Sequence, residues 1–106
     1  MRFFLVFEPE AKLEFDEAHD YYELAQKGLG KKFRLAVRES LSRIRRTPLS
    51  RGVIYPPDVR RVLVSKYPYA VMYRVKSNNQ IRVVSVFHSS RNPLIWQKRA
   101  DDLGEN

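Results

Sequence analysis

Residues 69–88 read YAVMYRVKSNNQIRVVSVFH, two runs rich in Val, Ile, Tyr and Phe that are separated by the turn-forming tetrapeptide SNNQ. A third run of the same character, VRRVLVSK at 59–66, precedes them and is joined to them by the dipeptide YP. We predict strands at 59–66, 69–76 and 81–88. Because connections this short leave no room for a crossover, the three strands must be antiparallel neighbours.

Side-chain alternation predicts which residues of the last strand share a face. Two sets are expected on opposite faces, namely Ile81, Val83 and Phe87 on one and Arg82, Val84, Val86 and His88 on the other. One face should pack against helices. The other is half apolar and ends in basic side chains, so we expect it to be the working surface.

Two amphipathic helices are predicted ahead of these strands. Apolar residues recur every three to four positions at 10–27 and again at 31–46. The KGLGKK segment between them favours a tight connection and hence a helical hairpin, and the opening FFLVFE adds a strand at 3–8. We therefore predict an α+β fold, in which an N-terminal strand and a two-helix hairpin pack on an antiparallel sheet of about four strands. Residues 1–106 are expected to form one domain, with a frayed acidic tail at 101–106.

The charge of the chain is divided unevenly along its length. Residues 1–26 hold seven acidic and two basic residues, whereas residues 27–99 hold 18 basic and two acidic ones, and the whole chain has a net charge of +8. The strong excess of basic residues at 27–99 favours an anionic partner, either nucleic acid or an acidic protein. Alternatively, the acidic first segment neutralises part of the basic remainder.

The composition also excludes several classes of protein. There is no cysteine, so disulfides, thiolate nucleophiles and cysteine-based zinc sites are excluded, which suits a reducing compartment. The opening apolar run is too short for a signal peptide, and no run is long enough to span a bilayer. We expect a soluble, cytoplasmic protein that does not bind membranes.

Metal-free RNA cleavage is the catalytic chemistry most compatible with the residues. It requires cations that hold phosphate and a group that moves a proton. His88 or a tyrosine is the candidate proton carrier, and the candidate phosphate ligands are Arg60, Arg61, Lys66, Arg82 and Arg91. The two histidines form no metal-ligand pattern, and no serine-hydrolase motif is present, so we expect no metal. The structural alternative is that His88 is a hydrogen-bonded strand-end residue and that Trp96 anchors the C-terminal segment by packing.

The order of these segments resembles the RelE/ParE superfamily of bacterial toxins. The resemblance covers residues 4–99 and rests on YPYAVMYRV at 67–75 and IRVVSVFHSSRNPLIWQKR at 81–99, behind a helical hairpin. It implies the toxin of a type II toxin-antitoxin pair, without a cofactor, whose partner is a small acidic antitoxin. RelE-like members cut mRNA in the ribosomal A site without metal, whereas ParE-like members inhibit DNA gyrase and cut nothing.

Two positions favour the ParE-like and plasmid-stabilisation branch. Ala70 stands where the resemblance to RelE-like nucleases implies an arginine, and Trp96, which lacks a hydroxyl, stands where it implies the aromatic residue that stacks on the mRNA base. A gyrase inhibitor that is not an enzyme is therefore the leading hypothesis. In it Arg60, Arg61, Lys66, Arg82 and Trp96 contact the target, and His88 and Arg91 are catalytic only if the protein is a nuclease. An mRNA endoribonuclease and a non-toxic basic RNA-binding domain are the alternatives.

Overall fold

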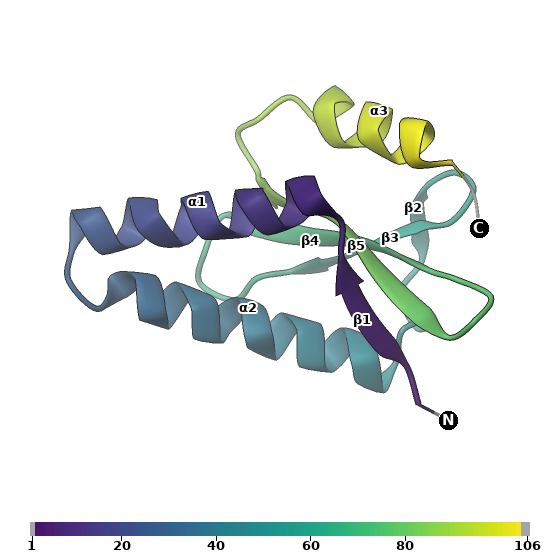
Figure 1. Ribbon diagram of the computed structural model, residues 1–106, viewed down its shortest axis with the longest axis horizontal. Coiled ribbons are helices and arrows are strands. Elements are labelled where there is room, and N and C mark those ends of the chain that lie inside the picture. Colours follow the sequence, from purple (N-terminus) through teal and green to yellow (C-terminus); the bar gives the residue numbers. More distant parts are fainter. Residues whose placement is uncertain (1, 105–106) are drawn as a thin grey trace.

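The computed structural model describes residues 2–104 and confirms an α+β fold (Figure 1). Along the chain the elements are β1 Phe4–Phe7, α1 Pro9–Ala25, α2 Leu29–Arg46, β2 Val53–Tyr55, β3 Val59–Leu63, β4 Tyr69–Val75, β5 Gln80–His88 and α3 Leu94–Leu103. Pro9 begins α1, where the missing N–H of proline costs no hydrogen bond. Gly28 precedes α2 with φ 89°, a conformation that glycine adopts without steric penalty.

The sheet has five strands in the order β1-β5-β4-β3-β2, so the prediction of an all-antiparallel sheet is wrong in one respect. β1 pairs in parallel with β5, and every other pair is antiparallel. No tight turn joins β1 to β5, because both helices and three strands lie between them, and their relative direction was therefore not fixed by loop length. β2 is a three-residue edge strand in the segment VIYPPD, whose two prolines are more typical of a loop.

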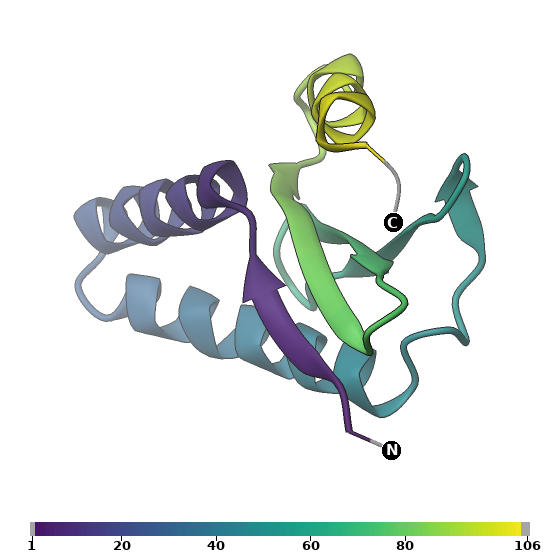
Figure 2. The ribbon, with the colours of Figure 1, turned by 45° about the vertical axis from the view of Figure 1, so that its right-hand side comes forward.

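The helical hairpin covers one face of the sheet, while α3 lies over the other (Figure 2). Phe33, Val37 and Ile44 of α2 are fully buried against the sheet, where Tyr73 of β4 is buried with them. The Tyr73 hydroxyl donates a hydrogen bond of 2.8 Å to the carbonyl of Pro48, in the loop that follows α2. More buried residues belong to the core between the hairpin and the sheet than to the core under α3, so the hairpin side holds the larger core.

A bulge in β5 changes the faces that alternation predicted. Met72 is opposite Ser85, but Tyr73 is opposite Val83, so Val84 is an extra residue in β5. Beyond this point the predicted faces are reversed. Val86 joins Ile81 and Val83 in the hairpin core, and Phe87 joins Val84 in the core on the opposite face.

Helix α3 was not predicted, and the expectation of a frayed tail is wrong for residues 101–103; residues 105–106 lie outside the described part. Trp96 and Ala100 are buried against Met72 and Phe87 of the sheet, which fixes the helix. Arg74, only 3% exposed, donates to the carbonyls of Ala100 and Gly104 at 3.2 and 2.8 Å. This guanidinium thereby satisfies carbonyls at the C-terminal end of α3.

Candidate functional site

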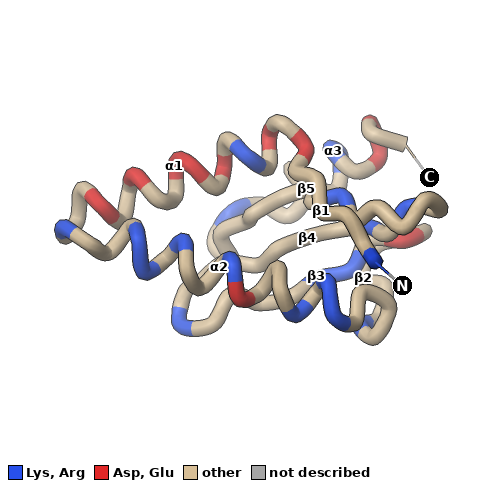
Figure 3. Tube along the Cα trace, turned by 60° about the horizontal axis from the view of Figure 1, so that its bottom comes forward, with Lys and Arg blue, Asp and Glu red and all other residues tan. Residues whose placement is uncertain are grey.

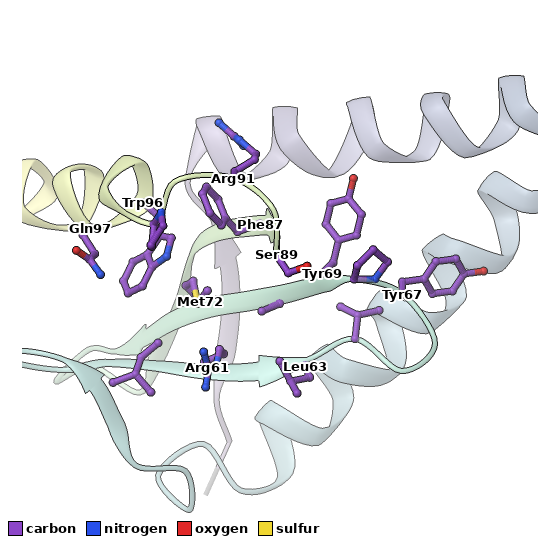
Figure 4. A pocket seen from close by; sticks show the side chains of 15 residues that line it. Arg61, Leu63, Tyr67, Tyr69, Met72, Phe87, Ser89, Arg91, Trp96 and Gln97 are labelled. Atoms are coloured by element: carbon purple, nitrogen blue, oxygen red, sulfur yellow. The ribbon is translucent and has the colours of Figure 1, made fainter.

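A groove of about 550 Å³ opens on the sheet face opposite the hairpin (Figure 4). Its walls are the edge formed by β2 and β3 on one side and the segment between β5 and α3 on the other. Its apolar lining consists of Ile54, Leu63, Val64, Pro68, Ala70, Met72, Phe87, Pro93 and Trp96, and its polar lining of Arg61, Tyr67, Tyr69, Ser89, Arg91 and Gln97. The groove is thus an apolar trough with a cation from β3 and a cation from the C-terminal segment at its margins.

The floor of the groove is formed by two apolar residues of β4, the small Ala70 and the flexible Met72. Ala70 lies in register between Leu63 of β3 and Phe87 of β5, and Met72 is the next β4 residue on this face. An arginine at position 70 would place a guanidinium in this space. Alanine leaves a hollow that suits an apolar side chain of a partner.

Trp96 forms one wall of the groove, and the alternative that it is a packing anchor is confirmed. The side chain is 4% exposed, and its ring meets Tyr55 edge to face with 5.5 Å between centroids. The Tyr55 hydroxyl in turn donates to the Asp101 carboxylate at 2.9 Å. Trp96 therefore shapes the groove while holding α3 against the sheet.

Arg91 at the groove margin is held by Glu14 of α1. Its guanidinium donates to Glu14 Oε2 at 2.9 Å and lies 4.7 Å from the Phe87 ring centroid. Glu14 also accepts from Arg99 of α3 at 2.8 Å, from the Ser85 hydroxyl at 2.8 Å and from the Val86 backbone N–H at 3.2 Å. One carboxylate, 9% exposed, thus joins α1, the part of β5 beyond its pairing with β1 and the C-terminal segment.

Electrostatics at this junction favour the ion pair. Burial lowers the pKa of Arg99. The hydrogen bond and the charge of Glu14, together with the charge of Glu10, raise this pKa by more than burial lowers it, so the net shift is upward. Arg99 therefore stays charged. Neither Glu14 nor Arg99 was among the residues that the sequence singled out.

His88 and Tyr69 meet beside this junction, at a smaller cavity of about 210 Å³ that Arg91 also lines. Their rings are edge to face with centroids 5.0 Å apart. His88 Nδ1 accepts the Ser90 backbone N–H at 3.0 Å, so in the neutral ring Nε2 carries the proton. Burial raises the pKa of the Tyr69 hydroxyl, and the nearby tyrosines of α1 add to the rise. The Tyr69 hydroxyl therefore stays protonated at neutral pH.

The remaining candidate cations do not converge on one site. Arg60 faces the hairpin side and donates to the carbonyls of Leu49 and Arg51. Arg82 is paired with the buried Glu8, away from the groove.

The last two candidate cations are exposed. Arg61 lines the groove, whereas Lys66 lies in the β3–β4 turn with φ 71°, because β3 ends at Leu63 rather than at 66. The structure thus brings Arg61, Arg91 and Trp96 to the groove and His88 to the adjoining cavity.

The lining of the groove is suited to binding a protein segment. Within residues 2–104 no three His, Cys, Asp or Glu side chains are grouped as metal ligands would be. In the same part of the chain, none of the helices is both long and apolar enough to cross a bilayer. An apolar floor with isolated cations at its margins fits a partner segment that carries apolar and acidic side chains.

A comparison with known proteins agrees with the observed fold and places the chain in a family. Residues 5–93 match the family described as the ParE toxin of the type II toxin-antitoxin system parDE. No curated protein sequence matches the chain significantly.

Solved structures with this fold include toxins of two kinds. One belongs to the chromosomal ParDE toxin-antitoxin system from P. aeruginosa, with a TM-score of 0.70 and 19% identity over 82% of this chain and 96% of that chain. A mutant of the E. coli toxin RelE in the free state has a TM-score of 0.73 and 18% identity over 99% of this chain and 100% of that chain. The same mutant in complex with a peptide of the antitoxin RelB has a TM-score of 0.63 and 18% identity over 94% and 96% of the two chains. At these identities the similarity establishes a shared fold.

Proposed function

The chain belongs to the family of ParE toxins of type II toxin-antitoxin systems, and from that premise we propose that it stops bacterial growth by binding DNA gyrase rather than by cutting RNA. The groove between β3, β4 and the C-terminal segment is the surface proposed to contact the target. Action on gyrase requires a cytoplasmic protein.

The apolar lining of the groove is the single observation that carries this proposal. A site that holds RNA phosphates without metal requires several cations directed at one point. In this chain Arg60 and Arg82 are occupied by internal partners, and Arg91 is paired with Glu14, which also binds Arg99. An apolar trough lined by Met72 and Phe87 offers the kind of surface that protein partners bury.

We further propose that a cognate antitoxin with an acidic segment covers the same surface. The P. aeruginosa structure is of a toxin-antitoxin system, and the RelE mutant was solved with an antitoxin peptide. The net charge of +8 supports an acidic partner for this chain. Association should slow as salt rises, because the Debye length falls from about 10 Å at 0.1 M to about 3 Å at 1 M.

Cleavage of ribosome-bound mRNA is the second candidate function, and one observation favours it. His88, Tyr69 and Arg91 line one small cavity, which would supply a proton carrier, an aromatic ring and a cation together. The pairing of Arg91 with Glu14 weakens this site.

Inducible expression in bacteria tests the proposal with a matched pair of variants. Leu63→Glu puts a carboxylate in the groove, and Leu49→Glu puts one at a leucine of nearly equal exposure, 61% against 63%, that does not line the groove. We expect the wild type and Leu49→Glu to stop growth and trigger a DNA-damage response with transcripts intact, and Leu63→Glu to lose both effects.

Different outcomes would overturn this assignment. Codon-phased cuts in translated mRNA that disappear in His88→Ala would establish the nuclease instead. Normal growth on induction of the wild type would favour a non-toxic RNA-binding domain.

A further inference from the structure

Helix α2 carries an excess of basic side chains that are outside ion pairs. It holds seven basic residues against one acidic residue, Glu39, and Figure 3 shows the basic residues along the helix. Within residues 2–104 no ion pair involves any of the seven. They are Lys31, Lys32, Arg34, Arg38, Arg43, Arg45 and Arg46. A helix with so much uncompensated positive charge favours an anionic ligand.

The helix dipole explains only part of this excess. Cations stabilise the last turn of a helix, where Arg45 and Arg46 lie. The dipole disfavours cations in the first turn, yet the start of α2 holds Lys31 and Lys32 and no acidic residue. Because the effect falls off within one turn of each end, it does not account for Arg38 in the middle of α2 either. Several cations of this helix are therefore not explained by its stability.

Three of these arginines line a hollow of about 360 Å³ at the place where α2 passes β1. Its apolar part consists of Leu5 from β1 and Leu41 from α2, which are both half-buried. The rest of its lining is polar and exposed, and consists of Arg38, Ser42, Arg45 and Arg46. Among the described residues, no carboxylate lines this hollow. Positive charge is therefore concentrated here without an acidic neighbour in the lining.

Two of the three arginines are positioned by internal contacts. Arg46 donates to Ser42 Oγ at 3.3 Å, and Arg45 donates to the carbonyl of Phe3 at 3.5 Å. Arg38 makes no hydrogen bond or ion pair within residues 2–104. Arg38 and Arg45 are seven residues apart, so helical geometry puts them on the same side of α2, about 10 Å apart along its axis. The hollow thus presents a row of guanidinium groups rather than a single cation.

From this lining we propose that the hollow binds the phosphate backbone of duplex DNA. A polar and strongly positive surface is typical of sites for nucleic acids, whereas interfaces between proteins bury an apolar centre. A guanidinium group contacts a phosphate through two parallel N–H···O bonds. The polar lining is exposed, so a long polyanion can lie across the hollow, while a small anion would lack enclosing walls. The choice of DNA over RNA rests on the proposed action on gyrase, whose substrate is duplex DNA.

The hollow is separated from the carboxylates of α1 and from the groove. The Phe15 ring packs on Phe33 with 6.2 Å between centroids, and a Cβ added at Gly30 would lie 2.8 Å from the carbonyl oxygen of His19. The carboxylates that follow Phe15 on α1 are therefore beside the first half of α2, whereas the hollow is at its second half. Leu5 of the hollow packs against the hairpin core, on the sheet face opposite the groove. One toxin molecule can therefore hold gyrase on one face and DNA on the other.

Fluorescence anisotropy of a labelled DNA duplex of about 20 base pairs tests the proposal with the purified whole chain and without gyrase. Three phosphate contacts predict that the logarithm of the association constant falls against the logarithm of the salt concentration with a slope of about −2.7. Arg38→Ala removes one contact, so the slope should change to about −1.8. By the same relation, the affinity at about 0.1 M salt should fall about eight-fold.

Matched variants and the opposing results complete the test. Arg45→Ala should cause the same loss as Arg38→Ala. Lys98→Ala removes an equal charge at an exposed residue of α3, on the other side of the sheet, and should leave the slope unchanged. Circular dichroism establishes that each variant is folded.

Three results would overturn the proposal. They are absence of binding at about 0.05 M salt with about 100 μM protein, equal losses in Arg38→Ala and Lys98→Ala, and tighter binding of an RNA duplex of the same sequence. Because gyrase is absent from the assay, its result does not depend on whether the wild type inhibits supercoiling.

Discussion

Removal of the Glu14 carboxylate should destabilise the protein more than removal of any other α1 carboxylate on the side that faces α3. The carboxylate is 9% exposed and accepts hydrogen bonds from two arginines, a serine hydroxyl and a backbone N–H. In Glu14→Ala the Arg99 guanidinium, also 9% exposed, loses its closest counter-charge. Breaking a buried ion pair from one side typically costs about 3 to 5 kcal/mol, because the remaining charge is left in a poorly solvated place.

The lower end of that range applies to this site. Arg99 keeps a contact of 3.3 Å with the exposed Glu10 and a hydrogen bond of 3.0 Å to the Val84 carbonyl. We therefore expect Glu14→Ala to lower the free energy of unfolding by about 3 kcal/mol. For a domain of this size, that loss corresponds to a fall in Tm of roughly 12 to 24 °C.

Urea and thermal unfolding of dilute protein would measure this effect against a matched control. Glu17→Ala removes a carboxylate one turn later on α1 whose side chain has no partner within the described residues, and should change the free energy by less than about 0.5 kcal/mol. Replacing both members, as in Glu14→Leu with Arg99→Leu, should cost less than the sum of the single replacements, since no unpaired charge is left. If Glu14→Ala and Glu17→Ala unfold at the same urea concentration, the junction does not hold α3 and the reasoning fails.

Three further changes test other contacts. Tyr73→Phe removes the buried hydroxyl that donates to the Pro48 carbonyl and should lower the free energy of unfolding by about 1 to 2 kcal/mol in urea melts. Gly30→Ala places a Cβ 2.8 Å from a backbone carbonyl of α1 and should cost about 1 to 3 kcal/mol, whereas Gly52→Ala meets no atom within 4 Å and should be close to neutral. Backbone N–H groups at the start of α2 lower the pKa of Glu23, so its stabilising effect is present above the ordinary carboxyl pKa and is lost as pH falls through the lowered value. Tm measured against pH should show this acid-side loss in the wild type and not in Glu23→Gln.

The main features of the fold could be predicted because their sequences contain periodic signals. The alternation at 69–76 and 81–88 and the helical spacing at 31–46 correspond to observed elements, with ends shifted by up to two residues. Features set by distant contacts could not be predicted. The parallel pairing of β1 depends on β5, and α3 is held by Arg74 and by burial of Trp96 against the sheet.

The bulge at Val84 shows the limit of alternation within one strand. An inserted residue leaves no mark in a run of valines, because valine suits either face of a strand that is buried on both sides. The predicted faces of Val86 and Phe87 were wrong for that reason.

Part of the candidate site could be predicted from the sequence. His88 and Arg91 lie near each other in the sequence, so their proximity could be predicted, and Trp96 was correctly weighed as a packing anchor. Glu14 could not be identified, since it is more than 70 residues from Ser85 and Arg91 and resembles the other acidic residues of its helix. Likewise, the engagement of Arg82 by Glu8 follows from the parallel placement of β1 beside β5.

Supercoiling of relaxed plasmid by purified gyrase tests the central claim most directly, namely that this toxin acts by binding a protein target through the groove. We predict that the purified wild-type chain inhibits supercoiling, that Leu49→Glu inhibits it equally and that Leu63→Glu does not. Full supercoiling at saturating wild-type chain, with cleavage of mRNA on translating ribosomes by the same preparation, would contradict the account.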